Sequence, residues 1–577
     1  MKNSNSKKDN SNIYMPGEEI KIAGDGMFKE WNDAENTPKV VNMPRIKFGI
    51  CCFIIAYAIV AIRLLDVCVL SNVNNINSNH KVHSSTIVHR ADIVDRNGVI
   101  IATSLPIKDL QTSKQKFKPK QTALDLVKIF PELKFDDLYE KLKSKTRHIA
   151  IRADLTPKQQ AKILAIGNPG LEFVANEKRF YLQKNLTSHV VGFVNVDNKG
   201  ISGLEYELNE RITTSDIPVK LSIDLGVQDT VRTILAKYQK KFAAKGAVAI
   251  MMDANTAEIV AMVSLPDFDP NSERGKPNNS NMATSYIYEP GSVLKVFNTA
   301  MAIDSGKVKP GEFFDTSPLK TPSRTITEFH NVGRPLNVEE ILVHSSNVGS
   351  ARMALQAGFT EQYNFLKRIK MLEKVKIELP EAARPLVQKE KQWKNDVSAI
   401  ATIGFGYGLA VSPLHLVASY AAVVNGGLYN NPTILSGKYN PENSVRVMSD
   451  NTSRQMRKML RAVVTKGSGR NADVVGYEVG GKTGTANKRE GRGYGKKKVC
   501  TSFLSAFPMS APKYVLIVMM DEPKGLKENY GHNEAGWNVV PATGEIIAAT
   551  APQLGVQAND DLEEKRSAKI IEAAFER

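Results

Sequence analysis

The residues of this chain that could do chemistry begin with a serine and a lysine three positions apart. Ser292 follows a turn-forming Pro-Gly pair, and Lys295 comes after it in the apolar run Val-Leu-Lys-Val-Phe. On a helix, residues three apart share a face, so the Lys295 amine can reach the Ser292 hydroxyl. A serine becomes a nucleophile when a neighbouring base takes its proton, and a lysine can be that base when burial and cationic neighbours lower its pKa. The pair therefore predicts an activated serine at the first turn of a helix, where the helix N-terminus adds positive potential.

The spacing of this pair is common and does not identify a site by itself. Ser4, Ser113 and Ser317 are also followed three positions later by lysine. Two further motifs distinguish Ser292, and both lie downstream: Ser345-Ser-Asn347 and Lys482-Thr-Gly-Thr485. Serine-lysine, serine-x-asparagine and lysine-threonine-glycine in this order are the pattern of penicillin-binding proteins and class A β-lactamases.

Each downstream motif also has a purely structural interpretation. Ser345 could be the N-cap of a helix, which is a common role for serine. Asn347 could bond only to backbone, and Lys482-Thr-Gly could end a strand before a turn. The three motifs together, in this order, favour the chemical interpretation.

Length and composition restrict the possible classes of protein. The 577 residues suggest three or four domains, and 42% hydrophobic with 24% charged residues is typical of a folded chain. The net charge of +17 indicates anionic surroundings such as headgroups, cell wall or nucleic acid. No nucleic-acid module is evident, so nucleic acid is not an expected partner. The four cysteines form no disulfide framework, and no spacing is typical of metal ligands, so neither metal nor cofactor is predicted.

The N-terminal part predicts a tail and a membrane anchor. Residues 1–44 are rich in Asn, Lys, Ser and Asp and lack an apolar period, which predicts a disordered cytoplasmic tail. Residues 45–70 contain an apolar run long enough to span a bilayer, with Arg45 and Lys47 on its N-terminal side. By the positive-inside rule this predicts a single-pass anchor with its N-terminal side in the cytoplasm and the rest of the chain exported. A cleaved signal peptide and a buried core helix are the alternatives.

The remaining chain predicts an α+β fold. Asn97-Gly98 indicates a hairpin, and residues 122–130 and 135–142 have the spacing of two amphipathic helices. In the second half we expect strands over 247–252 and 258–263, joined as a hairpin. Helices are expected over 338–369 and 412–425, and two further strands over 498–506 and 514–520. Strands first, helices next and strands last predict one sheet packed against a helical set.

Taken together, the chain resembles the class B penicillin-binding proteins, the monofunctional D,D-transpeptidases, and within them the division-specific, penicillin-binding-protein-3-like group. The segments that carry this resemblance outside the catalytic motifs are Arg90–Gly98, Arg179-Phe-Tyr181, His189–Phe193, Gly203-Leu-Glu205, Leu221–Asp224 with Gln228, Gly404–Leu409 and Val411–Leu414. The chain departs from the family at Ala91, where glycine is usual, and at Leu182, where proline is usual. The resemblance implies a mixed α/β pedestal, or dimerisation-like, domain over 71–240. It also implies a serine β-lactamase-like transpeptidase domain over 241–557, an antiparallel sheet flanked by helices, before a polar tail over 558–577.

The resemblance also implies a role for each catalytic residue. Ser292 would attack the penultimate D-Ala carbonyl of a peptidoglycan stem peptide, with Lys295 as its base. Ser345 would relay a proton to the leaving amine, and Asn347 would hold the substrate amide and Lys295. Lys482 would add positive charge near Ser345 and help keep Lys295 neutral.

Substrate binding is expected at the third motif. The hydroxyls of Thr483 and Thr485 suit the terminal carboxylate, and Gly484 has no side chain to obstruct the ligand. The backbone N–H groups of Ser292 and Thr485 would form the oxyanion hole. β-Lactams would acylate the same serine. The other expected partners are the membrane, a septal glycan polymerase and further division proteins.

Four other functions remain open at this point. An elongation-type class B enzyme has the same catalytic trio, but threonine at 483 and the ending Glu534-Ala-Gly-Trp537 with Pro552 look more septal. A membrane-anchored β-lactamase would hydrolyse penicillin in sustained turnover. An antibiotic sensor would need several spans and an intracellular effector. An inactive division scaffold is disfavoured by intact Ser292, Lys295 and Lys482.

Overall fold

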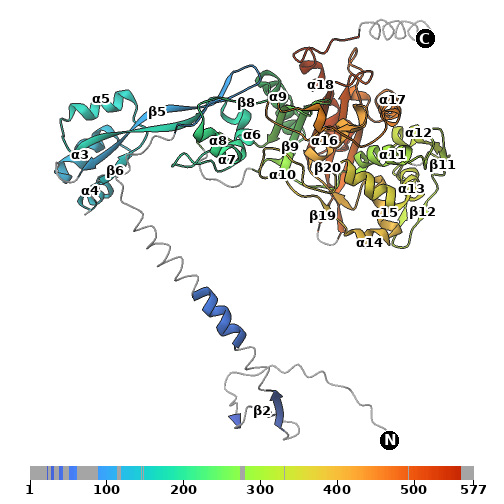
Figure 1. Ribbon diagram of the computed structural model, residues 1–577, viewed down its shortest axis with the longest axis horizontal. Coiled ribbons are helices and arrows are strands. Elements are labelled where there is room, and N and C mark those ends of the chain that lie inside the picture. The colour runs from blue at the N-terminus through green and yellow to red at the C-terminus, as the bar shows by residue number, and fades with distance from the viewer. Residues whose placement is uncertain are drawn as a thin grey trace. The chain divides into compact units, whose positions relative to one another are not determined.

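Figure 1 shows the computed structural model of the chain, which divides into two compact units, Met1–Thr86 and Ile87–Arg577. The structure describes residues 22–23, 27–31, 38–42, 51–61, 89–113, 118–144, 146, 148–272, 280–330, 332–490 and 493–559. The predicted polar tail over 558–577 lies almost wholly outside the described residues.

The first unit contains three short strands and one helix. β1 (Ile22–Ala23), β2 (Met27–Trp31) and β3 (Pro38–Asn42) pair antiparallel in that order, inside the segment predicted as a tail. A helix over 51–61 lies within the predicted anchor, and the rest of the anchor lies outside the described residues. Of the helices in the described ranges, none is both long and apolar enough to cross a bilayer.

One long strand, β5 (Ile100–Ser113), organises the sheet of the pedestal domain (Figure 1). It pairs antiparallel with β4 (Ile93–Val94), β6 (His148–Arg152) and β7 (Leu171–Tyr181), and β8 (Val219–Lys220) joins β4 in parallel. The turn between β4 and β5 contains Gly98 at φ 87°, a left-handed conformation that glycine adopts without a steric cost. The hairpin predicted from Asn-Gly is therefore confirmed.

Helices cover the outer part of this sheet. α3 (Pro119–Ile129), α4 (Phe135–Lys143) and α5 (Pro157–Ala165) enclose a small apolar core that includes Leu126 and Leu142. The first two are the helices predicted on either side of Pro131. The chain then forms η2 (Lys184–Thr187), α6 (Ser188–Val191), α7 (Gly203–Glu207) and α8 (Asn209–Thr214).

A buried group of charged residues joins three of the segments that carry the family resemblance. Glu205 accepts hydrogen bonds from Arg90 Nη2 at 2.5 Å and from Arg179 Nε at 2.7 Å, and all three side chains are buried. Arg90 also donates to the Asn198 carbonyl oxygen and to Asn209 Oδ1. Burying a charge is costly unless it is paired, so these contacts specify how the pedestal segments assemble.

The predicted transpeptidase domain is built on a five-stranded antiparallel sheet in the order β10-β9-β21-β20-β19. Its strands are β9 (Gly246–Asp253), β10 (Ile259–Leu265), β19 (Gly480–Glu490), β20 (Gly493–Phe507) and β21 (Tyr514–Asp521). Strands from both ends of the domain meet when β9 pairs with β21. The prediction of one sheet formed by early and late strands is confirmed, and β19 with the lysine-threonine-glycine motif is an edge strand.

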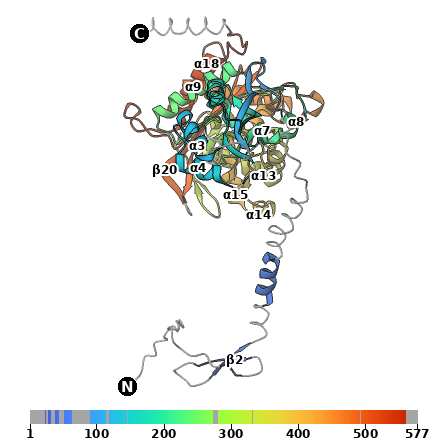
Figure 2. The ribbon, with the colours of Figure 1, turned by 90° about the vertical axis from the view of Figure 1, so that its left-hand side faces the viewer.

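Each face of this sheet packs against an apolar core. Successive side chains of a strand point to opposite faces, and in the central strands the side chains on both faces are apolar. Ala249 and Met251 face one core, to which α9 (Leu225–Lys241) and α18 (Val539–Thr550) contribute. Ile250 and Met252 face the other core, which the central helices fill. α9 and α18 lie side by side in both views (Figure 1, Figure 2). α9 thus packs with the transpeptidase sheet, although the sequence predicts a boundary after residue 240.

The central helices and small strand pairs complete the domain. The helices are α10 (Met282–Ser285), η3 (Gly291–Val293), α11 (Leu294–Asp304), α12 (Val338–Val343), α13 (Asn347–Arg368), α14 (Glu390–Lys394), α15 (Val397–Phe405), α16 (Pro413–Val424), η4 (Pro441–Asn443), α17 (Asp450–Lys466), η5 (Arg470–Ala472), η6 (Lys527–Asn529) and η7 (Ala535–Trp537). The two-residue strands are β11 (Phe313–Phe314), β12 (Leu319–Lys320), β13 (Thr325–Ile326), β14 (Leu336–Asn337), β15 (Leu386–Val387), β16 (Leu409–Ala410), β17 (Leu428–Tyr429) and β18 (Val445–Arg446). The helix predicted over 338–369 is interrupted, and the interruption between α12 and α13 contains the second motif.

Candidate active site

Ser292 lies on the short helical turn η3, immediately before α11. Gly291 precedes it at φ 60° and donates its N–H to the Gly406 carbonyl oxygen at 3.0 Å. A Cβ atom on Gly406 would lie 2.2 Å from the Gly291 carbonyl carbon, so only glycine allows these two backbones to approach so closely. The glycine-rich segment noted in the sequence therefore supports the turn that carries the nucleophile candidate.

Lys295 lies on α11, one turn after Ser292, and is fully buried. Its Nζ donates to the Ser345 carbonyl oxygen at 2.5 Å, to Ser345 Oγ at 3.2 Å and to Asn347 Oδ1 at 2.8 Å. The structure thus brings the second motif to the lysine of the first. An amine that has lost one proton keeps two hydrogens for such bonds and one lone pair that can accept another proton.

Ser345 is not the N-cap of α13. Its backbone has φ 57°, the left-handed region that a non-glycine residue rarely adopts. The cap is the next residue, Ser346, whose Oγ accepts from the Gly349 N–H at 2.9 Å. The structural alternative for Ser345 is therefore wrong, and its hydroxyl is available to the two lysines.

Lys482 on β19 approaches the same hydroxyl from the sheet. Its Nζ donates to Ser345 Oγ at 2.9 Å, and its side chain is fully buried. Burial lowers the pKa of Lys482 to about 7. Burial first, and then the charge of Lys482, hold the pKa of Lys295 well below its usual value, while Glu328 raises it. Lys482 can therefore exchange a proton near neutral pH, and the surroundings of Lys295 favour its neutral amine.

The two threonines of the third motif point to the other face of β19. Thr483 Oγ1 and Ser468 Oγ are 2.7 Å apart, and Thr485 Oγ1 accepts from the Ala535 N–H at 3.1 Å. Because the Thr485 oxygen is the acceptor there, its hydroxyl hydrogen remains for a ligand.

Gly484 faces the turn that carries Ser292. A Cβ atom at this position would lie 2.6 Å from the Pro290 carbonyl oxygen and 2.8 Å from Val293 Cγ2. Glycine is thus required for the contact between β19 and η3, which is a different reason from the ligand clearance expected from sequence.

Two residues that contact the motifs have no recognisable signal in the sequence. Glu328, in the loop after β13, accepts hydrogen bonds from Ser346 and from the Asn347 N–H. Ser468, after α17, contacts Thr483 as described above. Neither belongs to a recognisable motif, because the fold of a loop brings each of them to the site and its spacing from the motif residues does not indicate this.

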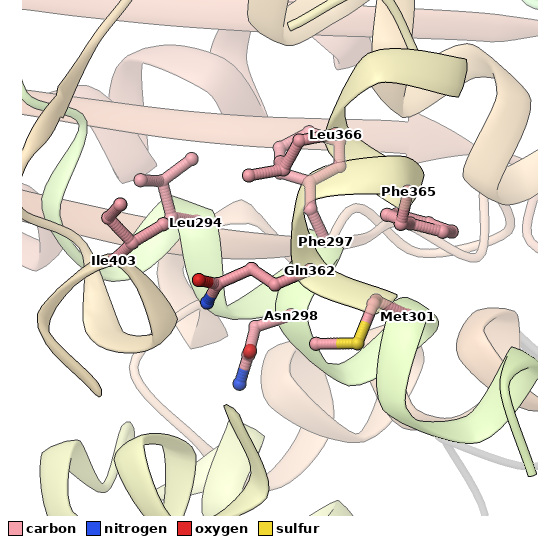
Figure 3. Close-up of a pocket in the computed structure, with 8 residues that line it drawn as sticks. All are labelled: Leu294, Phe297, Asn298, Met301, Gln362, Phe365, Leu366 and Ile403. Carbon is pink, nitrogen blue, oxygen red and sulfur yellow. The ribbon is translucent and has the colours of Figure 1, made fainter. Parts of the chain in front are cut away.

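The helix that carries Lys295, α11, packs on α13 and α15 (Figure 3). Asn298 Nδ2 donates to the Ser350 carbonyl oxygen at 2.9 Å, and Ser350 Oγ donates to the Gly404 carbonyl oxygen at 2.7 Å. The cavity lined by the eight residues in Figure 3 has a volume of about 10 Å³, enough for one water at most. This region therefore positions the site and does not bind substrate.

A larger groove begins beside η3, the turn that carries Ser292. It has a volume of about 650 Å³, and its lining includes Tyr288, Glu289, Gly408 and residues 486–488 of β19. Tyr288 and Glu289 lie shortly before η3, and residues 486–488 directly follow Thr485, so an extended ligand on the edge of β19 can continue into the groove. In the described part of the chain, no cluster of three or more His, Cys, Asp or Glu side chains could hold a metal ion.

Two family models match the chain. The penicillin-binding protein transpeptidase domain matches residues 247–539, and the penicillin-binding protein dimerisation domain matches residues 85–217. The first match covers about half of the chain and contains all three motifs. The chain belongs to the penicillin-binding protein transpeptidases. The second match, over residues 85–217, lies inside the segment 71–240 for which a pedestal domain is expected, and the bounds of that domain stay a prediction.

Relatives and solved structures agree with this membership. A probable peptidoglycan D,D-transpeptidase FtsI from Caulobacter vibrioides is 34% identical over 492 residues, which cover 82% of each chain. A probable peptidoglycan D,D-transpeptidase PenA from Neisseria meningitidis is 29% identical, over 75% of this chain and 80% of its own. The crystal structure of penicillin-binding protein 3 from Mycobacterium tuberculosis, complexed with aztreonam, has a TM-score of 0.65 at 23% identity, covering 82% of this chain and 98% of its own. This last similarity concerns the fold.

Proposed function

We propose that this chain cross-links peptidoglycan stem peptides at the division septum through an acyl-enzyme on Ser292. The chain is a serine-type peptidoglycan D,D-transpeptidase of the penicillin-binding class, in keeping with its family and relatives. The observation that carries the assignment of residues is the convergence of Lys295 and Lys482 on Ser345 Oγ, at 3.2 and 2.9 Å.

The first half-reaction forms the acyl-enzyme. Ser292 Oγ attacks the carbonyl carbon of the penultimate D-Ala, and Lys295 accepts the hydroxyl proton through its lone pair. The backbone N–H groups of Ser292 and Thr485 stabilise the oxyanion, a type of contribution worth about 3–4 kcal/mol for each donor. Ser345, held between both lysines, passes a proton to the leaving amine, and the terminal D-Ala departs.

The second half-reaction transfers the acyl group. An amine of a second stem peptide attacks the ester carbonyl carbon and gives a proton to Lys295. Lys295 returns a proton to Ser292 Oγ, which leaves with its hydroxyl restored. Asn347 holds the substrate amide and Lys295, while Thr483 and Thr485 bind the carboxylate of the donor. β-Lactams acylate Ser292 in the same way as the donor peptide.

A transfer assay tests this proposal. The full-length chain is incubated with a peptide ending in D-Ala-D-Ala and an acceptor amine, and released D-Ala and transferred product are both quantified. We expect both products from the wild type and neither from Ser292→Ala. Sustained hydrolysis of penicillin without any transfer would instead identify a β-lactamase.

The septal role is supported by the relatives named FtsI. A septal enzyme predicts that depletion in the dividing host gives filaments with blocked septa. Rounded cells that still divide would assign the chain to elongation.

The partners we propose are a membrane-embedded glycan polymerase and other division proteins, which contact the anchor and the pedestal. Site-specific photocrosslinking from exposed pedestal residues tests this, and labelling of the transpeptidase domain alone would reject it.

The membrane topology is also part of the proposal. We place residues 1–44 in the cytoplasm, an uncleaved single-pass anchor over 45–70 in the inner membrane, and the pedestal (71–240) and transpeptidase (241–557) domains in the periplasm. The support is the apolar run with basic residues before it. A reporter fused after Arg577 should be active only outside the cytoplasm, and activity inside the cytoplasm rejects the topology.

A further inference from the structure

Glu328 contacts the second catalytic motif from a loop that has no catalytic motif of its own. Its carboxylate accepts hydrogen bonds from the Ser346 hydroxyl, from the Asn347 N–H at 2.7 Å and from the Val348 N–H at 3.2 Å. These donors are the first groups of α13, whose N–H groups have no partner within the helix. A carboxylate at this position also interacts favourably with the helix dipole.

The residue before Glu328 fixes the orientation of the Asn347 side chain. The Thr327 carbonyl oxygen accepts from Asn347 Nδ2 at 3.3 Å. This bond turns Asn347 Oδ1 toward Lys295 Nζ, 2.8 Å away. The loop therefore determines both where α13 begins and which atom of Asn347 meets the catalytic lysine.

The charge of Glu328 acts on Lys295 as well. Burial and Lys482 disfavour a proton on the Lys295 amine, and Glu328 opposes them by raising the pKa of that amine. Two other charged residues line the same surface cleft and have partners of opposite charge: Asp315 pairs with Arg352, and Arg334 pairs with Glu340. Glu328 instead bonds to the hydroxyl and N–H donors of the catalytic motif.

We propose that Glu328 is a positioning residue of the transpeptidase reaction, which holds the Ser345–Asn347 segment against Lys295 and stabilises that amine when it receives the Ser292 proton. This inference rests on the proposed function, because the proton transfer is the one assigned to Ser292 and Lys295. Without the carboxylate, the Ser346 hydroxyl and the Asn347 and Val348 N–H groups lose their acceptor, and the amine loses its nearby negative charge.

The test measures acylation by a fluorescent penicillin as a function of pH, using the full-length chain and Glu328→Gln. Misplacement of the second motif should lower the plateau rate about tenfold or more. Loss of the negative charge lowers the pKa of Lys295, so the rising limb of the profile should move about one unit to lower pH. Glu328→Asp keeps the charge with a shorter reach, so its limb should remain at the wild-type pH and its plateau should lie between the other two.

Asp315→Asn is the matched control, because it removes an acid from the same cleft without touching the second motif, and its limb should not move. A Glu328→Gln limb at the wild-type pH overturns the proposal, whether the plateau falls or not, since a merely structural role would leave the limb in place. If Glu328→Gln does not fold, Glu328→Asp decides, and a shifted limb in that variant overturns the proposal. A wild type that is not acylated at Ser292 would refute the proposed function itself.

Discussion

Lys295 donates a hydrogen bond to the Ser345 carbonyl oxygen at 2.5 Å, and Ser345 holds a left-handed backbone with φ 57°. Such a conformation costs a non-glycine residue about 1–3 kcal/mol, and it persists only where surrounding contacts impose it. Here the contacts come from two buried lysines. The strained residue between α12 and α13 therefore joins Lys295 on α11 to Lys482 on the sheet.

Replacing the base should be nearly as damaging as replacing the nucleophile. Residues that act as one unit have non-additive effects, so Lys295→Ala should reduce the rate of acylation by penicillin almost as far as Ser292→Ala does. Stopped-flow fluorescence with a labelled penicillin measures the rate. Lys307→Ala, at an exposed lysine after the same helix, serves as control and should retain the wild-type rate. A Lys295→Ala protein that keeps more than a tenth of the rate contradicts the assignment.

Stability should rise with pH because of Lys482. Its pKa is about 7 in the folded chain and near 10.5 when unfolded, so between these values the unfolded chain binds more protons. The free energy of unfolding should then increase with pH by up to about 1.4 kcal/mol per unit from this group. Lys482→Met lacks this contribution. In urea unfolding, the free energy of the wild type minus that of Lys482→Met should grow from pH 7 to 10, and a constant difference would disprove the lowered pKa.

Gly484 should tolerate no side chain. Gly484→Ala places Cβ 2.6 Å from the Pro290 carbonyl oxygen, so β19 and the Ser292 turn have to separate. Overpacking of this kind costs about 1–3 kcal/mol, and acylation should fall with it. Gly311→Ala is the matched control, because a Cβ there meets nothing within 4 Å. Thermal unfolding and acylation are measured on both variants, and equal behaviour would show that the contact is not tight.

The pedestal should depend on its buried carboxylate. Glu205→Gln leaves Arg90 and Arg179 buried without a negative partner, which typically costs about 3–5 kcal/mol. Glu210→Gln, at an exposed position nearby, should leave stability unchanged. Thermal unfolding of the full-length chain compares the two. A melting temperature of Glu205→Gln that matches the control would mean that the buried charges contribute little.

The sequence predicts the sheet well because its strands have local signals. Apolar runs at 247–252 and 514–520 become β9 and β21, and they pair with each other in the structure. The three motifs converge as the family resemblance implies. These features depend on short-range patterns that a single sequence contains.

What the sequence does not predict depends on contacts through space. The interruption at Ser345 is hidden inside a segment with helical periodicity, because the lysines that impose it lie far away in the chain. Glu328 has no motif, and the neighbour of Gly484 is known only once β19 meets η3. The packing of α9 with the transpeptidase sheet likewise follows from the two faces of that sheet and not from a change in composition.

If Ser292 is the nucleophile, penicillin must form its covalent adduct on this residue, and mass spectrometry can locate that adduct. The full-length chain is treated with penicillin, digested, and searched for the covalent adduct, with Ser292→Ala as the paired sample and its folding checked by circular dichroism. We expect one adduct, on Ser292, and none in the folded variant. An adduct on another residue, or labelling that persists in folded Ser292→Ala, would contradict it.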